Sequence, residues 1–258
     1  MEINLKNQIS LVTGATGKIG GSIALQLAKS GSDVVIHYKS NSERAEELKR
    51  LIESHGRNAI CLSADLTKKN QVIILKERIS KELGNPRIII ANAVSQVFPW
   101  KPMLEEDPEK YENQFRSCLM QSVYLAQIFL PSISDGKGGR FIAISTECVM
   151  QNFPGQSAYV SGKRALDGAL RSLAREVGPK LITVNQVAPG WMKSDQEIKN
   201  DTNEFNIREK KYIEKVPLGK RGDVDEIANI VTFLASEKAS FITGTWIPVC
   251  GGFVLPAI

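Results

Sequence analysis

The sequence predicts an α/β fold: a doubly wound parallel sheet of about seven strands with helices on both faces. Three observations predict it. Short apolar runs alternate with longer segments of helical periodicity, a glycine-rich turn follows the first run, and no linker, repeat or low-complexity tract interrupts the alternation. We therefore expect one domain that spans residues 1–258.

Each expected strand is an apolar run bounded by glycine, proline or polar residues. In chain order these runs cover 8–13, 33–38, 58–64, 87–91, 140–146, 181–188 and 245–249. The segments between them place apolar residues on one helical face, which predicts helices over 19–30, 42–55, 68–83, 107–130, 157–178 and 223–235. Residues 191–216 are polar and irregular, and this segment is long enough to be a substrate-binding lid.

Composition excludes several classes of protein. The net charge is only +5 without a concentrated basic patch, which argues against nucleic acid as a partner. No apolar run is long enough to cross a membrane, and the N-terminus lacks the core of a signal peptide. The four cysteines show no C-x-x-C pairing and there are two histidines, so we expect no metal site and reduced thiols in a cytoplasmic protein.

The turn after the first strand carries three glycines at a spacing of three, Gly14, Gly17 and Gly20. Glycine lets backbone amides approach a pyrophosphate, and the following helix offers its unpaired N–H groups and positive dipole end. A glycine turn without a ligand is the alternative. The position in the first βα turn favours a nucleotide site.

The end of the second strand selects the nucleotide. An acid there would bond the adenosine ribose of NAD, but the chain reads Tyr38-Lys39-Ser40, and Asp33 lies at the opposite end of the strand. Lys39, Ser40 and Lys18 are able to meet a 2′-phosphate, so we predict NADP(H) rather than NAD(H). The alternative is that these lysines only form an exposed rim.

Tyr159 and Lys163 are four residues apart and share one face of a predicted helix. An ammonium beside a phenol favours the phenolate, so the pKa of Tyr159 is expected to fall from about 10. Such a phenol exchanges a proton with a carbonyl or alcohol oxygen near neutral pH. Taken alone, the pair also fits an ordinary amphipathic helix.

Together these motifs make the chain resemble the short-chain dehydrogenase/reductase family, and within it the 3-oxoacyl carrier-protein reductases and related carbonyl reductases. The resemblance runs through Thr13–Gly20, Asp65, Ala91–Val94, Tyr159 with Lys163, Asn185–Gly190, Thr243-Gly244 and Gly251-Gly252. It implies a Rossmann-like fold and hydride transfer between a nicotinamide and a substrate carbon.

The resemblance also implies the roles of individual residues. Tyr159 would exchange the proton, Lys163 would lower its pKa and hold the nicotinamide ribose, and Thr146 would bond the substrate oxygen where serine is usual. Ser145 should face the opposite side of the strand. The implied cofactor-binding residues are Gly14, Thr16, Gly17, Lys18, Ile19, Gly20, Tyr38, Lys39, Ser40, Asp65, Leu66, Asn92, Ala93, Tyr159, Lys163, Pro189, Gly190, Met192 and Ser194.

Three positions depart from the family pattern. Lys18 replaces a glycine and Val94 replaces another. Cys118 stands where an asparagine normally anchors the water of the proton relay, and a thiol is a weak donor and acceptor. Gln121 is a candidate substitute in that relay.

We expect an NADP(H)-dependent oxidoreductase that acts on a ketone or secondary alcohol. Lys18 and the His37-Tyr38 ending also resemble pteridine reductases, although those carry an acid at the position of Thr146 and here Glu147 follows it. Cys118 motivates a third alternative, a cofactor-binding subunit with little catalysis.

The remaining expectations concern assembly and the substrate pocket. Helix 107–130 is apolar on two sides and helix 157–178 carries small residues, so we expect these two helices to form a homodimer or homotetramer. Residues 94–100 and the lid should select the small-molecule carbonyl substrate. Phe98, Trp100 and Trp191 are either an apolar wall of that pocket or packing residues.

Overall fold

The computed structural model of the chain describes residues 2–95, 98–133, 138–193 and 203–255. Seven parallel strands form one sheet in the order β3-β2-β1-β4-β5-β6-β7. Their bounds are β1 Ile9–Val12, β2 Asp33–Tyr38, β3 Ala59–Ser63, β4 Ile88–Ala91, β5 Gly139–Ile144, β6 Ile182–Pro189 and β7 Trp246–Val249. The predicted doubly wound fold is confirmed.

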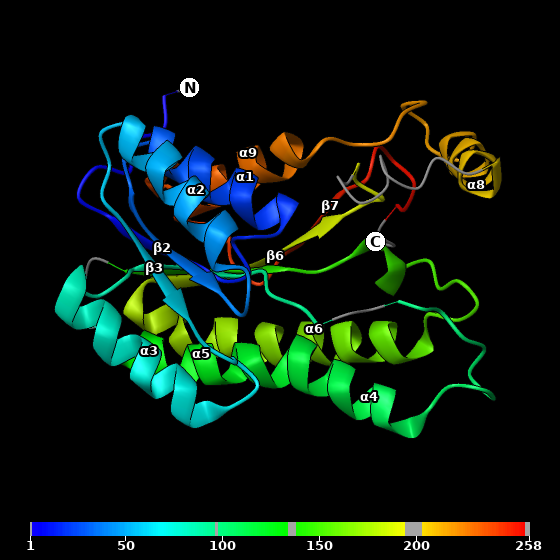
Figure 1. The fold of residues 1–258 in the computed structure, drawn as a ribbon, viewed down its shortest axis with the longest axis horizontal. Helices are drawn as coiled ribbons and strands as arrows, with labels where there is room; N and C mark the ends of the chain where they lie inside the picture. Colours follow the sequence, from blue (N-terminus) through cyan, green and yellow to red (C-terminus); the bar gives the residue numbers. More distant parts are fainter. Residues whose placement is uncertain (1, 96–97, 134–137, 194–202, 256–258) are drawn as a thin grey trace.

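Helices cover both faces of this sheet (Figure 1). One layer contains α1 (Lys18–Lys29), α2 (Ser42–Ser54) and α9 (Val224–Ala235). The opposite layer contains α3 (Lys69–Glu82), α4 (Pro108–Phe115), α5 (Gln121–Phe129) and α6 (Ser157–Val177). Helix α8 (Asn203–Ile213) lies beyond the end of the sheet.

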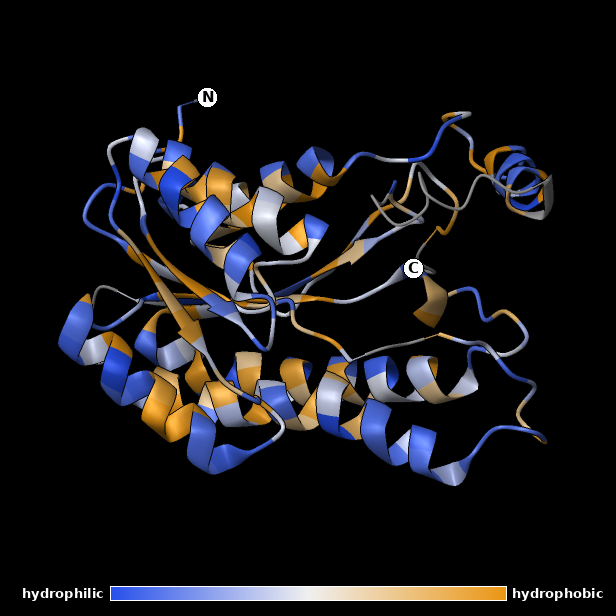
Figure 2. Ribbon diagram, in the orientation of Figure 1, coloured by the Kyte–Doolittle hydropathy of each residue, from blue (hydrophilic) through white to orange (hydrophobic). Residues whose placement is uncertain are grey.

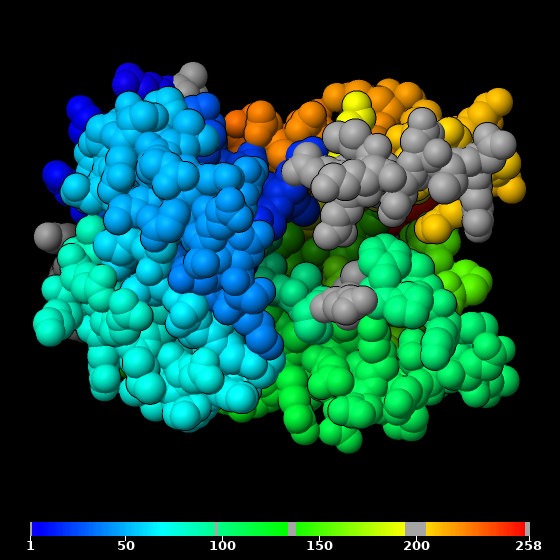
Figure 3. Space-filling view, in the orientation of Figure 1, coloured from blue at the N-terminus to red at the C-terminus, as the bar shows by residue number. Residues whose placement is uncertain are grey.

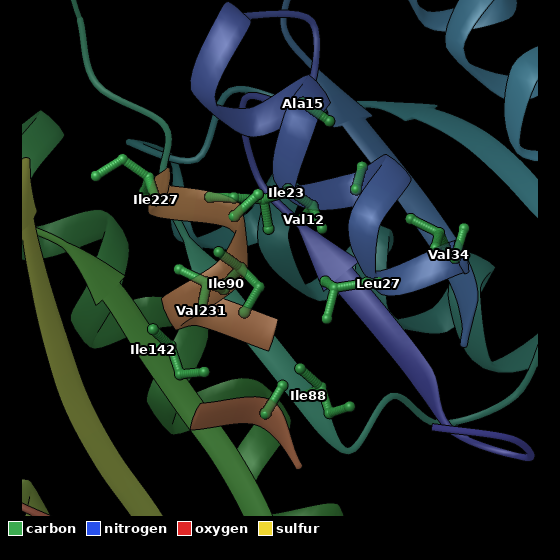
Figure 4. Packing of buried hydrophobic residues seen from close by; sticks show 14 of the residues in the cluster. Val12, Ala15, Ile23, Leu27, Val34, Ile88, Ile90, Ile142, Ile227 and Val231 are labelled. Atoms are coloured by element: carbon green, nitrogen blue, oxygen red, sulfur yellow. The ribbon is translucent and has the colours of Figure 1, made fainter. Parts of the chain in front are cut away.

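Each face of the sheet has its own apolar core. Successive strand residues point to opposite faces, so Val12 packs with Ile23 and Leu27 of α1, whereas Leu11 joins the cluster under α3, α5 and α6 (Figure 4). Figure 2 shows the apolar surfaces of the helices turned toward the sheet. Burial on both faces explains why the strands read as continuous apolar runs.

Two predicted elements differ from the structure. The helix expected over 107–130 is interrupted: a π-helical turn, Arg116–Met120, separates α4 from α5, and a 3-10 turn, Leu130–Ser132, follows. The segment 191–216, expected to be irregular, contains α8. Both differences have a physical reason, because one added residue barely disturbs a helical pattern and α8 has a weak apolar stripe.

The carboxyl ends of the strands meet at one edge of the sheet. The strand order reverses between β1 and β4, which is where α/β sheets leave a crevice for ligands. Figure 3 shows the molecule hollowed between the blue N-terminal segments and the green segments of the middle of the chain. In the described part of the chain, no helix combines the length and the apolar character needed to span a bilayer.

Candidate active site

The glycine turn between β1 and α1 packs too closely for side chains. Gly14 has a φ of +63°, and a Cβ there would lie 2.9 Å from the Ala93 Cα. A Cβ on Gly20 would lie 2.4 Å from the Gly14 carbonyl oxygen. Gly17 is the N-cap of α1 and gives it no side-chain cap, and the first turn carries no acid. The N–H groups of a helix N-terminus suit an anion, and binding of a pyrophosphate at this turn stays a prediction.

Residues of β4 hold the turn in place. The Thr13 Oγ1 donates to the Ile90 carbonyl (3.0 Å) and accepts from the N–H groups of Asn92 (2.9 Å) and Ala93 (3.0 Å). The Asn92 Nδ2 donates to the Thr13 carbonyl (2.9 Å). The predicted cofactor residues Asn92 and Ala93 therefore adjoin the glycine turn, and Thr16 and Ile19 lie half-buried within it.

His37 supports the turn from β2, a role that no motif in the sequence predicted. Its Nδ1 accepts from the Gly14 N–H (3.1 Å), so its Nε2 carries the proton and donates to the Ala64 carbonyl (3.1 Å). Burial lowers the pKa of His37 to about 4. The only signal in the sequence is a titratable residue inside an apolar strand.

Charged residues meet at the ends of β2 and β3. The Lys39 Nζ lies 3.0 Å from the Asp65 Oδ2, beside the half-buried Tyr38, the exposed Ser40 and the buried Leu66. Burial opposes ionisation of Asp65, but hydrogen bonds from Thr67 and Lys39 hold its pKa at about 2. At the opposite end of β2, Asp33 accepts from Arg57 and Asn58, which is a structural role.

Helix α6 brings Tyr159 and Lys163 under the end of β5. Lys163 is only 3% exposed, and its Nζ donates to the Ile144 carbonyl (2.6 Å) and lies 5.9 Å from the centre of the Tyr159 ring. The Thr146 side chain is hydrogen-bonded to Tyr159. Ser145 accepts from the Trp246 indole N–H (3.2 Å), so it faces away from Thr146, as expected for neighbouring residues.

The expected decrease in the pKa of Tyr159 is wrong for this arrangement. Desolvation raises the pKa of the Tyr159 hydroxyl, and the Thr146 hydrogen bond opposes the increase only in part. Burial likewise lowers the pKa of Lys163. The Lys163 Nζ donates one hydrogen bond to the Ile144 carbonyl, and Tyr159 is a neutral phenol because its hydroxyl is desolvated.

Cys118 packs against α6 at the π-helical turn. A Cβ on Gly162 would lie 3.2 Å from the Cys118 Cβ, and the Cys118 thiol lies 3.6 Å from the Gln114 Oε1. Burial raises the pKa of Cys118, so the thiol stays protonated. The Gln121 Nε2 donates to the carbonyls of Ala93 and Ser117, which commits this nitrogen to the backbone.

The turn after β6 contacts Tyr212, Glu147 and Arg221, which no motif predicted to be part of the site. A Cβ on Gly190 would lie 2.8 Å from the Tyr212 hydroxyl and 2.9 Å from the Glu147 Oε2. The buried Arg221 donates to the carbonyls of Trp191 (3.2 Å) and Met192 (2.6 Å). Ser194, predicted to bind the cofactor, lies outside the described residues.

The three aromatic residues of the expected wall separate into two groups. Trp100 lies 6.0 Å from Tyr159 and 4.7 Å from Phe98, measured between ring centroids, so Trp100 adjoins the Tyr159 ring and Phe98 packs on Trp100. Trp191 packs instead on Phe205 (5.7 Å) and Tyr212 (5.4 Å) of α8.

Comparisons with known proteins agree with this geometry. A family model described as "Enoyl-(Acyl carrier protein) reductase" matches residues 14–254. The chain is 32% identical to the 3-oxoacyl-[acyl-carrier-protein] reductase FabG of Pseudomonas aeruginosa, covering 98% of this chain and 100% of that protein. It is 31% identical to the hydroxynaphthalene reductase-like protein Arp2 of Metarhizium brunneum, covering 97% and 96%.

Solved structures give the same result. A 7α-hydroxysteroid dehydrogenase in complex with NADH and 7-oxo glycochenodeoxycholic acid superposes with a TM-score of 0.90 at 26% identity, covering 97% of this chain and 96% of that one. Acetoin dehydrogenase from Enterobacter cloacae superposes with a TM-score of 0.85 at 27% identity, covering 97% and 96%. The chain therefore belongs to the short-chain dehydrogenase/reductase family of nicotinamide-dependent oxidoreductases.

Proposed function

We propose that this protein is an NADP(H)-dependent reductase of ketones, of the 3-oxoacyl or small-carbonyl type. The observation that carries the proposal is that Thr146, just after the carboxyl end of β5, lies beside Tyr159 and Lys163 of α6. The FabG and Arp2 proteins named above support a ketone as the substrate class.

The chain's own residues supply the proton and position the carbonyl. A reduced nicotinamide, when bound, supplies a hydride for the carbonyl carbon. Tyr159 gives its phenolic proton to the carbonyl oxygen as that oxygen becomes an alkoxide, and the product is an alcohol. The Thr146 hydroxyl donates a hydrogen bond to the same oxygen and holds the carbonyl near Tyr159.

A raised pKa suits this direction of reaction. A neutral phenol is the proton donor that carbonyl reduction requires, and the Lys163 ammonium beside it stabilises the phenolate left after transfer. Cys118 offers only a weak hydrogen bond for returning a proton to Tyr159, so reprotonation is the step that we expect to be slow.

The preference for NADP(H) rests on the ends of β2 and β3. The second strand ends without an acid, and Lys39 lies at the rim of this region with 70% of its side chain exposed. Lys39 already pairs with Asp65, and it would also form an ion pair with the 2′-phosphate of NADP(H). The related 7α-hydroxysteroid dehydrogenase was solved with NADH, so the two cofactors must be compared directly.

The experiment measures binding and turnover together. NADPH and NADH are titrated against the protein, and turnover is then followed with ethyl acetoacetate, 2-tetralone and one dihydropterin. We expect tighter binding of NADPH and turnover of a ketone. Turnover of the pterin alone would support the pterin reductase, and tight cofactor binding without any turnover would support a non-catalytic subunit.

We also propose that the protein forms a homodimer or homotetramer through α4–α5 and α6. A groove of about 310 Å³ lies between α5 and α6, and its lining is mainly apolar. Among its lining residues, Leu119, Val123 and Leu173 keep part of their surface accessible. Pairing across a two-fold axis would bury this groove against the same groove of a second copy.

A further inference from the structure

Glu147 joins three segments of the active site. It follows Thr146 directly, in the 3-10 turn Glu147–Val149 after β5, and is only 3% exposed. Its Oε1 accepts from the Tyr212 hydroxyl of α8 (2.9 Å). The Tyr212 oxygen accepts in turn from the Trp191 N–H (2.9 Å), in the turn after β6.

The carboxyl group is held at a cost to stability. The Glu147 Oε2 is buried and has no hydrogen-bond partner among the residues that the structure describes. Burial raises the pKa of Glu147 to about 7, against the opposing hydrogen bonds from Tyr212 and Trp191. An incompletely paired buried acid weakens a fold, so its position calls for a functional explanation.

The hydrogen-bonded pair of Glu147 and Tyr212 packs against Gly190. A Cβ on Gly190 would lie within 2.9 Å of both the Tyr212 hydroxyl and the Glu147 Oε2, so the two polar groups pack directly against this glycine. Membership of the short-chain dehydrogenase/reductase family implies that the Pro189-Gly190 turn lies under the nicotinamide, and the proposed function requires this. The pair is therefore in contact with the backbone that must hold the ring.

Aromatic and charged neighbours hold Tyr212 and α8 in place beside this turn. Its ring packs on Phe253 (4.6 Å) and Trp191 (5.4 Å), measured between centroids. Arg221 lies 4.3 Å from the Trp191 ring and pairs with Glu209 of α8 (2.9 Å). Helix α8 is thus fixed to the site by Arg221 on one side and by the Tyr212–Glu147 hydrogen bond on the other.

We propose that Glu147 is a positioning residue: through Tyr212 it fixes α8 and the Pro189–Trp191 turn in the arrangement that receives the nicotinamide. The proposal rests on the proposed function, because only a cofactor-binding turn gives this contact a use. Removing the Tyr212–Glu147 bond takes away one of the polar contacts that attach α8 to the site. The cofactor must then order this region when it binds, which weakens its affinity.

The test compares Tyr212→Phe, Glu147→Leu and Glu147→Gln with the wild type. Tyr212→Phe removes one hydroxyl and keeps the ring contacts. Glu147→Gln keeps an oxygen that accepts from Tyr212, so it should rescue what Glu147→Leu loses. Lys211→Met, at an exposed position of the same helix, is the matched control.

Three measurements are made: hydrogen exchange of residues 203–213, the Kd for NADPH, and KM and kcat with ethyl acetoacetate. We expect Tyr212→Phe and Glu147→Leu to exchange faster in α8 and to raise the Kd and the KM for NADPH about tenfold, with kcat changed less than about threefold. Glu147→Gln and Lys211→Met should resemble the wild type.

Unchanged exchange in α8 and an unchanged Kd in Tyr212→Phe would overturn the inference, even if Glu147→Leu fails to fold. Exchange is measured without cofactor or substrate. It therefore decides the role of Glu147 separately from ketone turnover, whose absence in the wild type would contradict only the proposed function.

Discussion

Tyr159 lies where desolvation outweighs the neighbouring charge. The i, i+4 spacing correctly placed Lys163 beside it, but the Lys163 Nζ donates to the Ile144 carbonyl, and the pKa of Tyr159 rises. Spacing along a helix shows which side chains are neighbours, but not which hydrogen bonds they choose or how much water they lose. The prediction of proximity was right, and the prediction of the pKa was wrong.

Cys118 gives a prediction at the scale of one residue. Cys118→Asn places a strong donor and acceptor beside Lys163 and Tyr159, so we expect kcat for ketone reduction to rise about three- to tenfold. Steady-state kinetics at saturating NADPH measure this. Cys118→Ala, which removes the thiol and adds no polar group, is the control. An unchanged kcat in Cys118→Asn would mean that reprotonation of Tyr159 is not slow.

The contacts that give other residues of the site their supporting roles could not be predicted from the sequence. His37, Arg221 and Tyr212 act through contacts between segments far apart in the chain: His37 binds Gly14, Arg221 binds Met192, and Tyr212 binds Glu147. Motifs identify residues that share a local pattern with a family. Supporting residues from distant segments become visible only when the fold brings the segments together.

At the scale of elements, the glycine turn and α1 behave as one unit. Gly20→Ala puts a Cβ 2.4 Å from the Gly14 carbonyl oxygen, so α1 must move away from β1. We expect a loss of about 2 kcal/mol or more in the free energy of unfolding, together with loss of NADPH binding. Urea unfolding and cofactor titration measure the two effects.

Gly168→Ala is the matched control for that prediction. A Cβ on Gly168 meets nothing within 4 Å, and the residue lies inside α6. Alanine there should stabilise the protein by about 0.5–1 kcal/mol without affecting cofactor binding. If both glycine substitutions had the same effect, close packing at the turn would not explain the role of Gly20.

The elements themselves were largely predictable. All seven strands lie within a residue or two of the ranges expected from apolar runs, because strands covered on both faces leave a strong pattern. The π-helical turn at Cys118 was not predictable, since it inserts one residue into an otherwise helical sequence. Helix α8 was also missed, because its apolar residues contact aromatic side chains rather than the sheet.

At the scale of the whole molecule, the groove between α5 and α6 predicts self-association. Val123→Asp places a charge in this groove, so we expect the variant to be a monomer in light scattering where the wild type is a dimer or tetramer. Ile74→Asp adds the same charge at a site on α3 that is 53% exposed and serves as the control. A monomeric wild type at micromolar concentration would contradict the proposal.

Stability should respond to pH through two groups with opposite signs. His37 has a pKa of about 4 in the folded protein against 6.5 in the unfolded chain. Its contribution to the free energy of unfolding is therefore complete above pH 6.5 and is lost as the pH falls toward 4. Glu147 has a pKa of about 7 against 4.5, so its contribution is complete below pH 4.5 and is lost as the pH rises toward 7.

Between pH 4.5 and 6.5 these two contributions oppose each other. Glu147→Gln removes the second, so the stability of this variant relative to the wild type should increase by up to about 3 kcal/mol between pH 4.5 and 7. Urea unfolding at pH 5 and pH 7.5 measures the difference. Parallel dependence of the two proteins on pH would show that Glu147 does not titrate in this range.

The most direct test of the proposed function is Tyr159→Phe, measured by NADPH binding and by turnover of ethyl acetoacetate. The substitution removes one hydroxyl and keeps the ring beside Trp100. We expect a Kd for NADPH within about threefold of the wild type and a kcat/KM lower by about 10²- to 10⁴-fold. Turnover at the wild-type rate in Tyr159→Phe would contradict the assignment of Tyr159 as the proton donor.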